Sequence, residues 1–520
     1  MSNIKAKNLP FLLLILDGWG VWNKKEGNAI ALAKTPITDG LYKKYPNVLL
    51  QASGSYVGLP SRQPGNSEAG HMNIGAGRQI EQDAVIISKS INNGTFFKNP
   101  AFLQAAHHVI KHKSDVHLMG LLSDGSSPHS DEDHLLSLIS FFISRTKQNI
   151  YLHLFTDGRD SPPYAASKIL SQYTSIFNSN RVKIATVMGR FYAMDRKKSW
   201  ERTKMAFDAM VTGKGNQVTS AVEAVSQAYN RGESDEYIKP SVIVDKDGAP
   251  IGPINKDDTV VFFNLRSDRA RQLTKVFAQE DFHKKNPGSF QPSLKVEDLL
   301  FVALTDFGPD LERVLTAYPG IDISDTLPIA LKNLRQCYIA ETEKYAHVTY
   351  FFNGGYDHPV AGEDWINIPS KDVFSYAEMP EMSTNEMTNR ILKDLKADKY
   401  NFWTVNFAAP DMVGHTGNLK AGIKAVELVD KAVGHIIEAT LAKNGTVVVT
   451  ADHGNVEEMI NLATKEIDTE HSVNPVPFVV ISNNNYKLKD GGKLANIAPT
   501  ILDIMGIDKP KLMSDKSLIV

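Results

Sequence analysis

Acids and histidines follow three apolar runs in the outer parts of the chain. The runs lead into Asp17, Asp411 and Asp452. Histidines accompany two of these acids, as His415 and as His453, and His471 precedes a further apolar run. Mixed carboxylate and imidazole ligands suit a divalent transition metal ion, and there are enough of them here for two ions. The pattern therefore predicts a metal centre.

Each of these motifs is weak evidence when it is taken alone. The tripeptide Asp452-His453-Gly454 is more often a turn than a ligand, and a lone histidine is more often a core or surface residue. The position of all the acids at strand ends reverses that judgement, because parallel strands bring their carboxyl ends to one edge of a sheet.

A serine lies in a stretch that predicts a turn followed by a helix, residues 63–78. Pro64 and Gly65 cannot prolong a strand, and small residues follow Ser67. Free N–H groups and the helix dipole favour an anion at such a helix start. Ser67 could be a simple N-cap. Beside a metal, however, its hydroxyl would have a lower pKa and could act as a nucleophile without a neighbouring base.

The middle of the chain carries cations where an anion could bind. Arg266 and Arg269 are three residues apart at the start of a predicted helix, so both can grip one phosphate or carboxylate. For any one surface arginine the alternative is a solvated face or a structural ion pair. Further candidates for the anion site are Arg190 and Arg196, Arg159 beside a possible acid or base Asp160, and His129.

An alternation of apolar runs and amphipathic segments must position these residues. It is typical of βαβ units and predicts largely parallel sheets covered by helices. Strands are expected at 11–16, 116–122, 150–155, 182–188, 259–265, 299–304, 338–340, 348–352, 402–407, 446–450 and 476–481, with a crossover near 309–323. Helices are expected at 134–146, 165–178, 200–211, 220–230 and 421–442.

Composition limits the possible partners. The 520 residues are 42% hydrophobic and 22% charged, which is typical of a globular protein, and the length favours two domains. The net charge of -2 without a basic run indicates neither nucleic acid nor a membrane surface as partner. The apolar run 11–16 is too short for a signal sequence, and the single Cys337 fits a reducing compartment, so a cytoplasmic location is expected.

With these residues assembled, the chain resembles the 2,3-bisphosphoglycerate-independent phosphoglycerate mutases of the alkaline-phosphatase-like superfamily. The resemblance covers nearly the whole chain, in order. Its motifs are Leu16-Asp17-Gly18-Trp19-Gly20, Gly65-Asn66-Ser67-Glu68-Ala69-Gly70-His71, Asp157-Gly158-Arg159-Asp160, Gly189-Arg190 through Arg196, Asn264-Leu265-Arg266-Ser267-Asp268-Arg269, Glu341-Thr342-Glu343-Lys344-Tyr345-Ala346-His347, Asp411 through Gly417, and Thr450-Ala451-Asp452-His453-Gly454-Asn455.

The resemblance implies a role for each candidate residue. One divalent metal ion, most often Mn²⁺ in the family, would lie between Asp411, His415 and His471. The other would lie between Asp17, Ser67, Asp452 and His453. Ser67 would take the phosphoryl group from 3-phosphoglycerate, and the retained glycerate would reorient and accept it as 2-phosphoglycerate. The implied phosphate clamp is Arg266, Arg269 and Lys344, and the implied glycerate site is His129, Arg159, Asp160, Arg190 and Arg196, with Asp160 as the base.

One loop departs from the family pattern. Where the family often reads Ser-Asp-Gly-Gly-Val-His-Ser-His, this chain has Ser123-Asp124-Gly125-Ser126-Ser127-Pro128-His129-Ser130-Asp131. Pro128 stiffens the loop, and Asp131 replaces the second histidine of the family pattern. The histidine of the implied glycerate site is retained as His129.

The expected fold is α/β with two domains. Residues 1–80 and 316–520 would form a discontinuous, alkaline-phosphatase-like metal and phosphoserine domain, and residues 83–312 an inserted substrate-binding domain. Crossings near 80 and 315 would act as a hinge whose closure excludes water. A monomer is expected by analogy with the family. The alternatives are a metal-dependent phosphatase or other phosphomutase on the same core, and a non-catalytic sensor of metal and anion.

Overall fold

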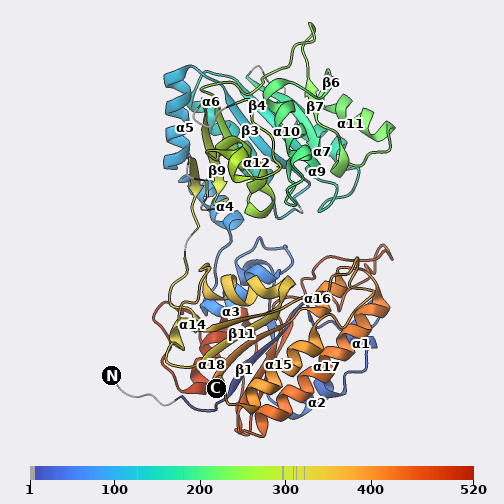
Figure 1. The fold of residues 1–520 in the computed structure, drawn as a ribbon, viewed down its shortest axis with the longest axis vertical. Helices are drawn as coiled ribbons and strands as arrows, with labels where there is room; N and C mark the ends of the chain where they lie inside the picture. The colour runs from blue at the N-terminus through green and yellow to red at the C-terminus, as the bar shows by residue number, and fades with distance from the viewer. Residues whose placement is uncertain are drawn as a thin grey trace. The chain divides into compact units, whose positions relative to one another are not determined.

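The computed structural model describes residues 6–125, 127–177, 179, 181–294, 298–308, 310–311, 313–320 and 322–520 (Figure 1). They form two compact units. The first holds the described residues up to Gln82 and those from 322 onward, and the second holds the described residues between 83 and 320. Each unit has its own sheet and its own apolar core. The predicted two-domain α/β class is confirmed.

The first unit is built on a mixed sheet with the strand order β12-β11-β13-β1-β14-β15-β2-β16. From β12 to β14 neighbouring strands are parallel, whereas β15 is antiparallel to both of its neighbours. The strands are β1 (Phe11–Leu16), β2 (Asn47–Gln51), β11 (Gln336–Glu341), β12 (Asp364–Ile368), β13 (Phe402–Phe407), β14 (Thr446–Thr450), β15 (Val476–Ile481) and β16 (Gly492–Lys493).

Helices cover both faces of this sheet (Figure 1). The long α17 (Leu419–Leu441) packs against α1 (Ala29–Leu32), α2 (Pro36–Lys44), α15 (Thr384–Lys396) and α16 (Ala409–Gly414), and α3 (Ser67–Ala76) packs against α14 (Leu327–Ala330) and α18 (Ile497–Met505). Strand β1 is central, and each of its six apolar side chains is at most 1% exposed. Burying a side chain of this size contributes about 1.5–3 kcal/mol.

The second unit has the strand order β10-β9-β8-β3-β4-β5-β7-β6, in which the strands from β10 to β5 are parallel and β7 is antiparallel to β5. The strands are β3 (Val116–Leu122), β4 (Ile150–Thr156), β5 (Val182–Gly189), β6 (Asn216–Val218), β7 (Ser241–Ile243), β8 (Thr259–Phe262), β9 (Leu300–Thr305) and β10 (Val314–Tyr318).

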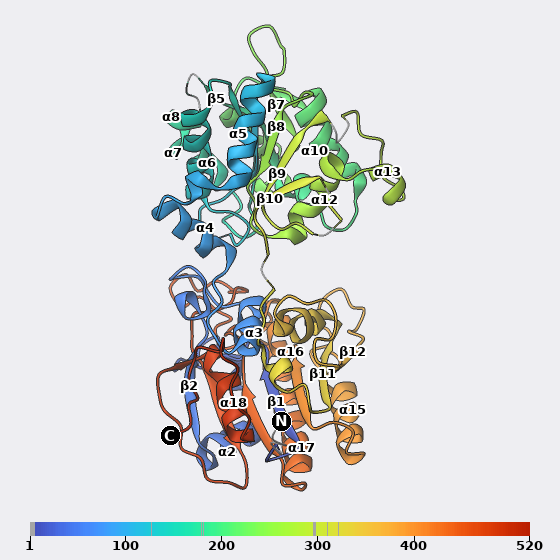
Figure 2. The same cartoon turned by 90° about the vertical axis from the view of Figure 1, so that its left-hand side faces the viewer.

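Two apolar cores lie on the two faces of this second sheet. Helices cover both faces (Figure 2). One is covered by α5 (Pro100–His112), α6 (Glu132–Arg145), α7 (Ala166–Gln172), α8 (Thr174–Phe177) and α11 (Ala221–Asn230). The other is covered by α10 (Trp200–Thr212), α12 (Ser267–Ala278) and α13 (Phe282–Lys285). The helices α4 (Asp83–Asn92) and α9 (Arg190–Ala193) complete the unit. No helix of the described residues combines the length and the apolar character that a membrane span requires.

Three of the element predictions were wrong. The run 348–352 is a turn of π-helix, His347–Phe351, because Val348 and Phe352, four residues apart, both face the core. The expected crossover at 309–323 contains β10, which pairs with β9, and its residues 309, 312 and 321 lie outside the described residues. The helix expected at 165–178 divides at Tyr173 into α7 and α8, and residue 178 lies outside the described residues.

Candidate active site

Charged side chains follow the parallel strands of the first unit and lie at one edge of its sheet. Lys344 follows β11, Asp411 follows β13, Asp17 follows β1 and Asp452 follows β14, and these four strands are neighbours in that order. Because β15 is antiparallel to β14, its beginning lies at the same edge and brings His471 there. The predicted convergence of Asp17, Asp411, Asp452 and the histidines is confirmed.

Ser67 is the first residue of α3, as the turn chemistry predicted. The Asn66 side chain caps the helix by accepting a hydrogen bond from the backbone N–H of Ala69 at 2.9 Å. Gly70 lets the helix approach the loop that holds Asp452, because a Cβ there would lie only 2.6 Å from the Asp452 carbonyl oxygen. The helix start therefore holds the Ser67 hydroxyl, which is 5% exposed, against the strand ends.

The Ser67 hydroxyl lies among three functional groups. Its Oγ is 2.7 Å from Lys344 Nζ, 2.9 Å from His453 Nε2 and 3.3 Å from Asp17 Oδ1. Since His453 Nδ1 lies 3.2 Å from the Gly454 carbonyl and donates there, Nε2 is free to accept the hydroxyl proton. Lys344 in turn donates to Ser67 Oγ. This arrangement polarises the hydroxyl for nucleophilic attack.

Lys344 is a buried cation held by carboxylates. Its Nζ donates to Asp17 Oδ1 and to Asp411 Oδ2, each at 2.7 Å. Burial by itself lowers the pKa of the Lys344 ammonium, but Asp17 and Asp411 more than offset this and raise the pKa above its usual range. Burial, followed by the neighbouring Asp452, raises the pKa of the Asp17 carboxyl to about 7.

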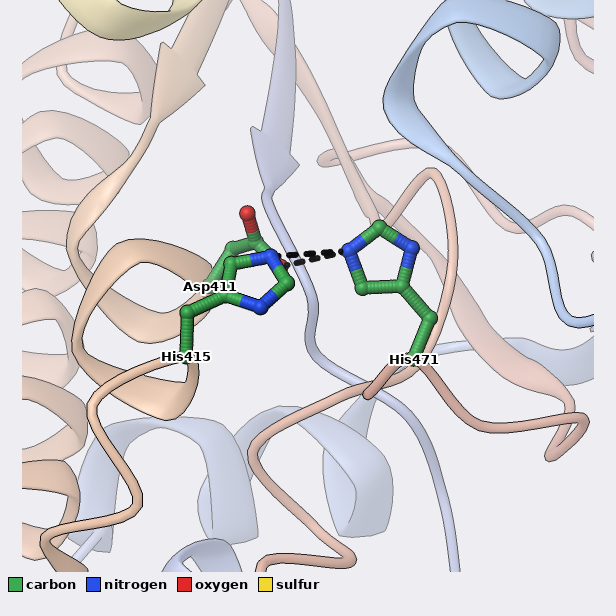
Figure 3. A group of neighbouring side chains, drawn as sticks. All are labelled: Asp411, His415 and His471. Carbon is green, nitrogen blue, oxygen red and sulfur yellow. Dashed lines mark hydrogen bonds and ion pairs between the residues drawn. The ribbon is translucent and has the colours of Figure 1, made fainter. Parts of the chain in front are cut away.

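Asp411, His415 and His471 form a compact donor group (Figure 3). His471 Nε2 lies 3.0 Å from His415 Nε2 and 3.3 Å from Asp411 Oδ1. The Nδ1 atoms of His415 and His471 lie 2.7 Å and 2.8 Å from the carbonyl oxygens of Thr469 and Gly65 and donate to them. Both Nε2 atoms therefore face the same point, an arrangement that either a shared proton or a metal ion would satisfy. The donors fit a metal ion.

The remaining predicted ligands also lie together. His453 Nε2 is 3.5 Å from Asp17 Oδ1 and 3.5 Å from Asp452 Oδ2. Ligand atoms of Asp17, Asp411 and His453 lie within 4.8 Å of one another, as do those of Asp17, His71 and Asp452. All five of these side chains are buried, and carboxylate and imidazole donors of this kind suit a divalent ion.

Three further residues that the motifs did not single out as ligands contact the site, namely His71, Asn406 and Asn455. His71 Nδ1 lies 2.9 Å from the Ser67 carbonyl oxygen and 3.3 Å from Asp452 Oδ2. Asn406 donates to Asp17 Oδ2 at 2.6 Å, and Asn455 donates to Asp411 Oδ1 at 2.8 Å. The sequence spacing could have predicted the position of His71, because it lies four residues after Ser67 and so on the same helix face.

The second unit gathers its charged residues in the same way. The neighbouring parallel strands β8, β3, β4 and β5 lead into Arg266, His129, Arg159 with Asp160, and Arg190. Arg190 is 2% exposed, and its Nη1 lies 2.6 Å from Asp157 Oδ1 and 2.5 Å from Asp160 Oδ2. Burial by itself raises the pKa of the Asp160 carboxyl, but Arg190 more than offsets it and holds the pKa below its usual value. Asp160 is therefore a carboxylate at neutral pH.

Several arginines lie around Arg269. Burial, with Arg190, Arg159 and Arg196 nearby, lowers the pKa of the Arg269 guanidinium to about 10. Arg159 and Arg196 are about half exposed, and they pair with Glu236 and Asp268 at 3.7 Å and 2.9 Å. A guanidinium whose pKa is lowered by neighbouring cations indicates a site that favours an anion.

The altered loop still places His129 beside Asp160. His129 Nε2 lies 4.0 Å from Asp160 Oδ2, to which Ser127 Oγ donates at 2.9 Å. Ser127 Oγ also accepts a hydrogen bond from the backbone N–H of His129 at 3.3 Å. Ser126 lies outside the described residues. The hydroxyl of Ser127 thus ties the loop to the carboxylate.

The burial of His129 predicts an acid-sensitive second unit. Burial, followed by repulsion from Arg190 and Arg266, lowers the pKa of the His129 imidazole to about 3. The unfolded value is about 6.5, so the unfolded chain takes up this proton first. The contribution of His129 to the free energy of unfolding is therefore fully present above pH 6.5. It is lost as the pH falls towards 3, and the loss reaches up to about 2 kcal/mol at pH 5.

His129→Gln is expected to reduce this loss. Urea unfolding at pH 7 and at pH 5 measures it, and His107→Gln, which changes an exposed histidine of α5, is the matched control. An equal loss of stability between the two pH values in His129→Gln and in the wild type would contradict the assignment.

Comparison with known proteins gives a consistent result. A model of the Metalloenzyme superfamily matches residues 9–509. The chain is 46% identical to proteins named 2,3-bisphosphoglycerate-independent phosphoglycerate mutase from Acetivibrio thermocellus, over 99% of this chain and 100% of the relative, and from Clostridium botulinum, over 98% and 99%. It also resembles the crystal structure of Leishmania mexicana phosphoglycerate mutase at low cobalt concentration, with a TM-score of 0.82, 28% identity, and coverage of 100% of this chain and 99% of that one.

Proposed function

The chain belongs to the family of 2,3-bisphosphoglycerate-independent phosphoglycerate mutases, and from this premise we propose how its residues interconvert 3-phosphoglycerate and 2-phosphoglycerate. The first unit, with the described residues up to 82 and from 322 onward, would be the metal and phosphoserine domain expected at 1–80 and 316–520. The second unit, with the described residues between 83 and 320, would be the substrate-binding domain expected at 83–312. The observation that carries the proposal is the Ser67 hydroxyl, held between Lys344 and His453 among metal-type donors.

We propose two divalent ions as cofactors, with Mn²⁺ in both sites. Asp411, His415 and His471 would hold one ion, and the other would be held by Asp17, Ser67, Asp452 and His453. When bound, the ions would lower the pKa of the serine hydroxyl and offset charge on the phosphoryl oxygens.

Ser67 would take the phosphoryl group in the first step. Its Oγ forms a bond to phosphorus while the bond from phosphorus to the glycerate 3-oxygen breaks, and the proton that the serine hydroxyl loses passes to the departing 3-oxygen, which leaves phosphoserine and free glycerate. Lys344, whose ammonium already donates to Ser67 Oγ at 2.7 Å, would hold the phosphoryl oxygens together with Arg266 and Arg269.

The glycerate would stay bound while it turns. Its carboxylate matches the cationic group of Arg159, Arg190 and Arg196, and His129 is a neutral hydrogen-bond partner beside it. In the return step the 2-hydroxyl attacks the phosphoserine while the bond from phosphorus to Ser67 Oγ breaks, and the proton of the 2-hydroxyl passes by way of the Asp160 carboxylate to the departing serine oxygen. The same steps in reverse convert 2-phosphoglycerate to 3-phosphoglycerate. We also propose that the protein is a cytoplasmic monomer, which sedimentation and cell fractionation would test.

Isotope labelling separates this proposal from the phosphatase alternative. Conversion of 3-phosphoglycerate in H₂¹⁸O, with no 2,3-bisphosphoglycerate, should give 2-phosphoglycerate without ¹⁸O in its phosphate, because water takes no part. Acid quenching during turnover, followed by peptide mass spectrometry, should find phosphate on Ser67. Free ¹⁸O-labelled phosphate as the main product would favour the phosphatase, and turnover without labelled Ser67 would contradict the phosphoserine step.

Removal of metal is expected to abolish turnover and to leave the fold intact. The facing Nε2 atoms of His415 and His471 would share a proton in place of the ion, so the site can close without collapse. Mutase activity after dialysis against a chelator should fall by about 10³-fold or more and return with added Mn²⁺, because the loss of transition-state charge stabilisation costs several kcal/mol. Circular dichroism should stay unchanged. Full activity in the metal-stripped protein would contradict the assignment.

A further inference from the structure

Glu457 is a buried carboxylate that no step of the proposed reaction uses. Its exposure is 0%, and among the described residues no lysine, arginine or histidine forms an ion pair with it. An ionised carboxylate in such a place is costly unless hydrogen bonds replace its water. The donors that surround it therefore indicate its role.

Four neutral donors satisfy this carboxylate. The backbone N–H groups of Gly20 and Asn455 donate to Oε2 at 3.0 Å and 2.8 Å. Asn474 Nδ2 donates to Oε1 at 3.0 Å, and the Ser472 hydroxyl donates to the same oxygen. Only an acceptor with two oxygens can accept from all four donors.

These donors come from three loops that carry proposed metal ligands. Gly20 lies three residues after Asp17, Asn455 lies two residues after His453, and Ser472 directly follows His471. The fourth ligand loop is reached indirectly, because the Asn455 side chain donates to Asp411 Oδ1 at 2.8 Å. One carboxylate thus fixes the positions of loops that are more than 400 residues apart in sequence.

Two glycines leave the room that this carboxylate needs. A Cβ at Gly20 would lie 2.3 Å from the Glu457 carboxyl, and a Cβ at Gly454 would lie 2.4 Å from Oε1 and 2.3 Å from Ser472 Oγ. Neither glycine has the left-handed backbone that would itself require glycine. Both are therefore explained by the close approach of the carboxylate.

We propose that Glu457 is a positioning residue for the metal centre. By holding three ligand loops together it sets the spacing of Asp17, His453 and His471 before an ion binds, so that less ordering is needed on binding. This inference rests on the proposed metal sites. It predicts that loss of the carboxylate weakens metal binding, because partners that orient metal ligands typically change affinity by about 10- to 100-fold.

Asp430 supplies a matched control. It is also a fully buried carboxylate of the first unit, and it accepts hydrogen bonds from the backbone N–H groups of Ile37 and Thr38 and from the Thr38 hydroxyl. Its partners belong to α2 and to no ligand loop. Asp430→Asn should therefore lower stability and leave metal affinity unchanged.

The test measures Mn²⁺ binding to metal-stripped full-length protein by calorimetry, together with the thermal midpoint of the metal-free form. In Glu457→Gln an amide NH₂ group replaces one accepting oxygen and so faces at least one of the four hydrogen-bond donors. This variant should weaken Mn²⁺ binding by about 10- to 100-fold. Asp430→Asn should bind Mn²⁺ within twofold of the wild type. The KM for 3-phosphoglycerate in Glu457→Gln at saturating Mn²⁺ should stay near the wild-type value.

The outcomes separate this inference from the proposed metal sites. If the wild type binds no Mn²⁺, the metal sites themselves are refuted. If the wild type binds and Glu457→Gln binds within twofold of it, the positioning role alone is overturned. If Glu457→Gln fails to fold, the same measurement on Ser472→Ala tests the positioning role, because this variant removes one hydroxyl donor to Glu457. It should weaken Mn²⁺ binding severalfold, and unchanged affinity would overturn the role.

Discussion

Replacing Ser67 by alanine is expected to reduce mutase turnover by about 10⁴-fold or more, since the loss of a covalent nucleophile removes the whole pathway that depends on it. The fold should remain, because Asn66 and not Ser67 caps α3. The measurement is conversion of 3-phosphoglycerate under saturating Mn²⁺, with circular dichroism as the check on folding.

Ser383→Ala provides the comparison for this loss. Ser383 is a buried serine of the same unit whose hydroxyl donates to the Pro369 carbonyl at 2.7 Å. Its removal should cost about 1 kcal/mol of stability and leave turnover near the wild-type value. Ser67→Ala with activity within tenfold of the wild type would refute the phosphoserine pathway.

Replacing Lys344 by methionine is expected to destabilise the metal-free protein by about 3–5 kcal/mol, because it leaves buried carboxylates without their cation. Asp17 and Asp411 are each at most 1% exposed and both accept hydrogen bonds from this ammonium. Added Mn²⁺ should restore much of the loss, since the ions would supply positive charge to the same carboxylates. Urea unfolding with and without a chelator measures both effects.

Lys371→Met is the control that tests whether the loss of any ion pair would destabilise the metal-free protein to the same extent. Lys371 pairs with Glu386, and both side chains are at least one-third exposed. Such surface pairs contribute about 0–1 kcal/mol. A metal-free Lys344→Met protein that loses no more than Lys371→Met would show that the carboxylates do not depend on the lysine.

Strand positions were predictable where apolar runs were continuous and ended in turn residues. The runs at 11–16, 116–122, 402–407, 446–450 and 476–481 have the predicted bounds. Local propensity failed at 348–352, where β-branched and aromatic residues favour a strand but the packing of Val348 and Phe352 selects a helical turn. Tertiary contacts decided that element.

The convergence of the site followed from strand order, but its internal contacts did not. Periodicity placed Asp17, Asp411 and Asp452 at strand ends, and the resemblance supplied Lys344 and the substrate-binding residues. Nothing in the spacing showed that Asn406 would donate to Asp17 or that Glu457 would accept from three loops. These contacts join segments that are far apart in sequence and depend on side-chain directions, which a pattern does not give.

The central position of β1 has a consequence during protein synthesis. Its two partner strands, β13 and β14, are made about 400 residues later. At about 5–20 residues per second, the run Phe11–Leu16 waits roughly 20 to 90 s on the ribosome for its place in the sheet. The second unit is continuous in sequence and can fold during that interval. We therefore expect nascent chains stopped before residue 402 to depend on chaperones that cover this one hydrophobic segment.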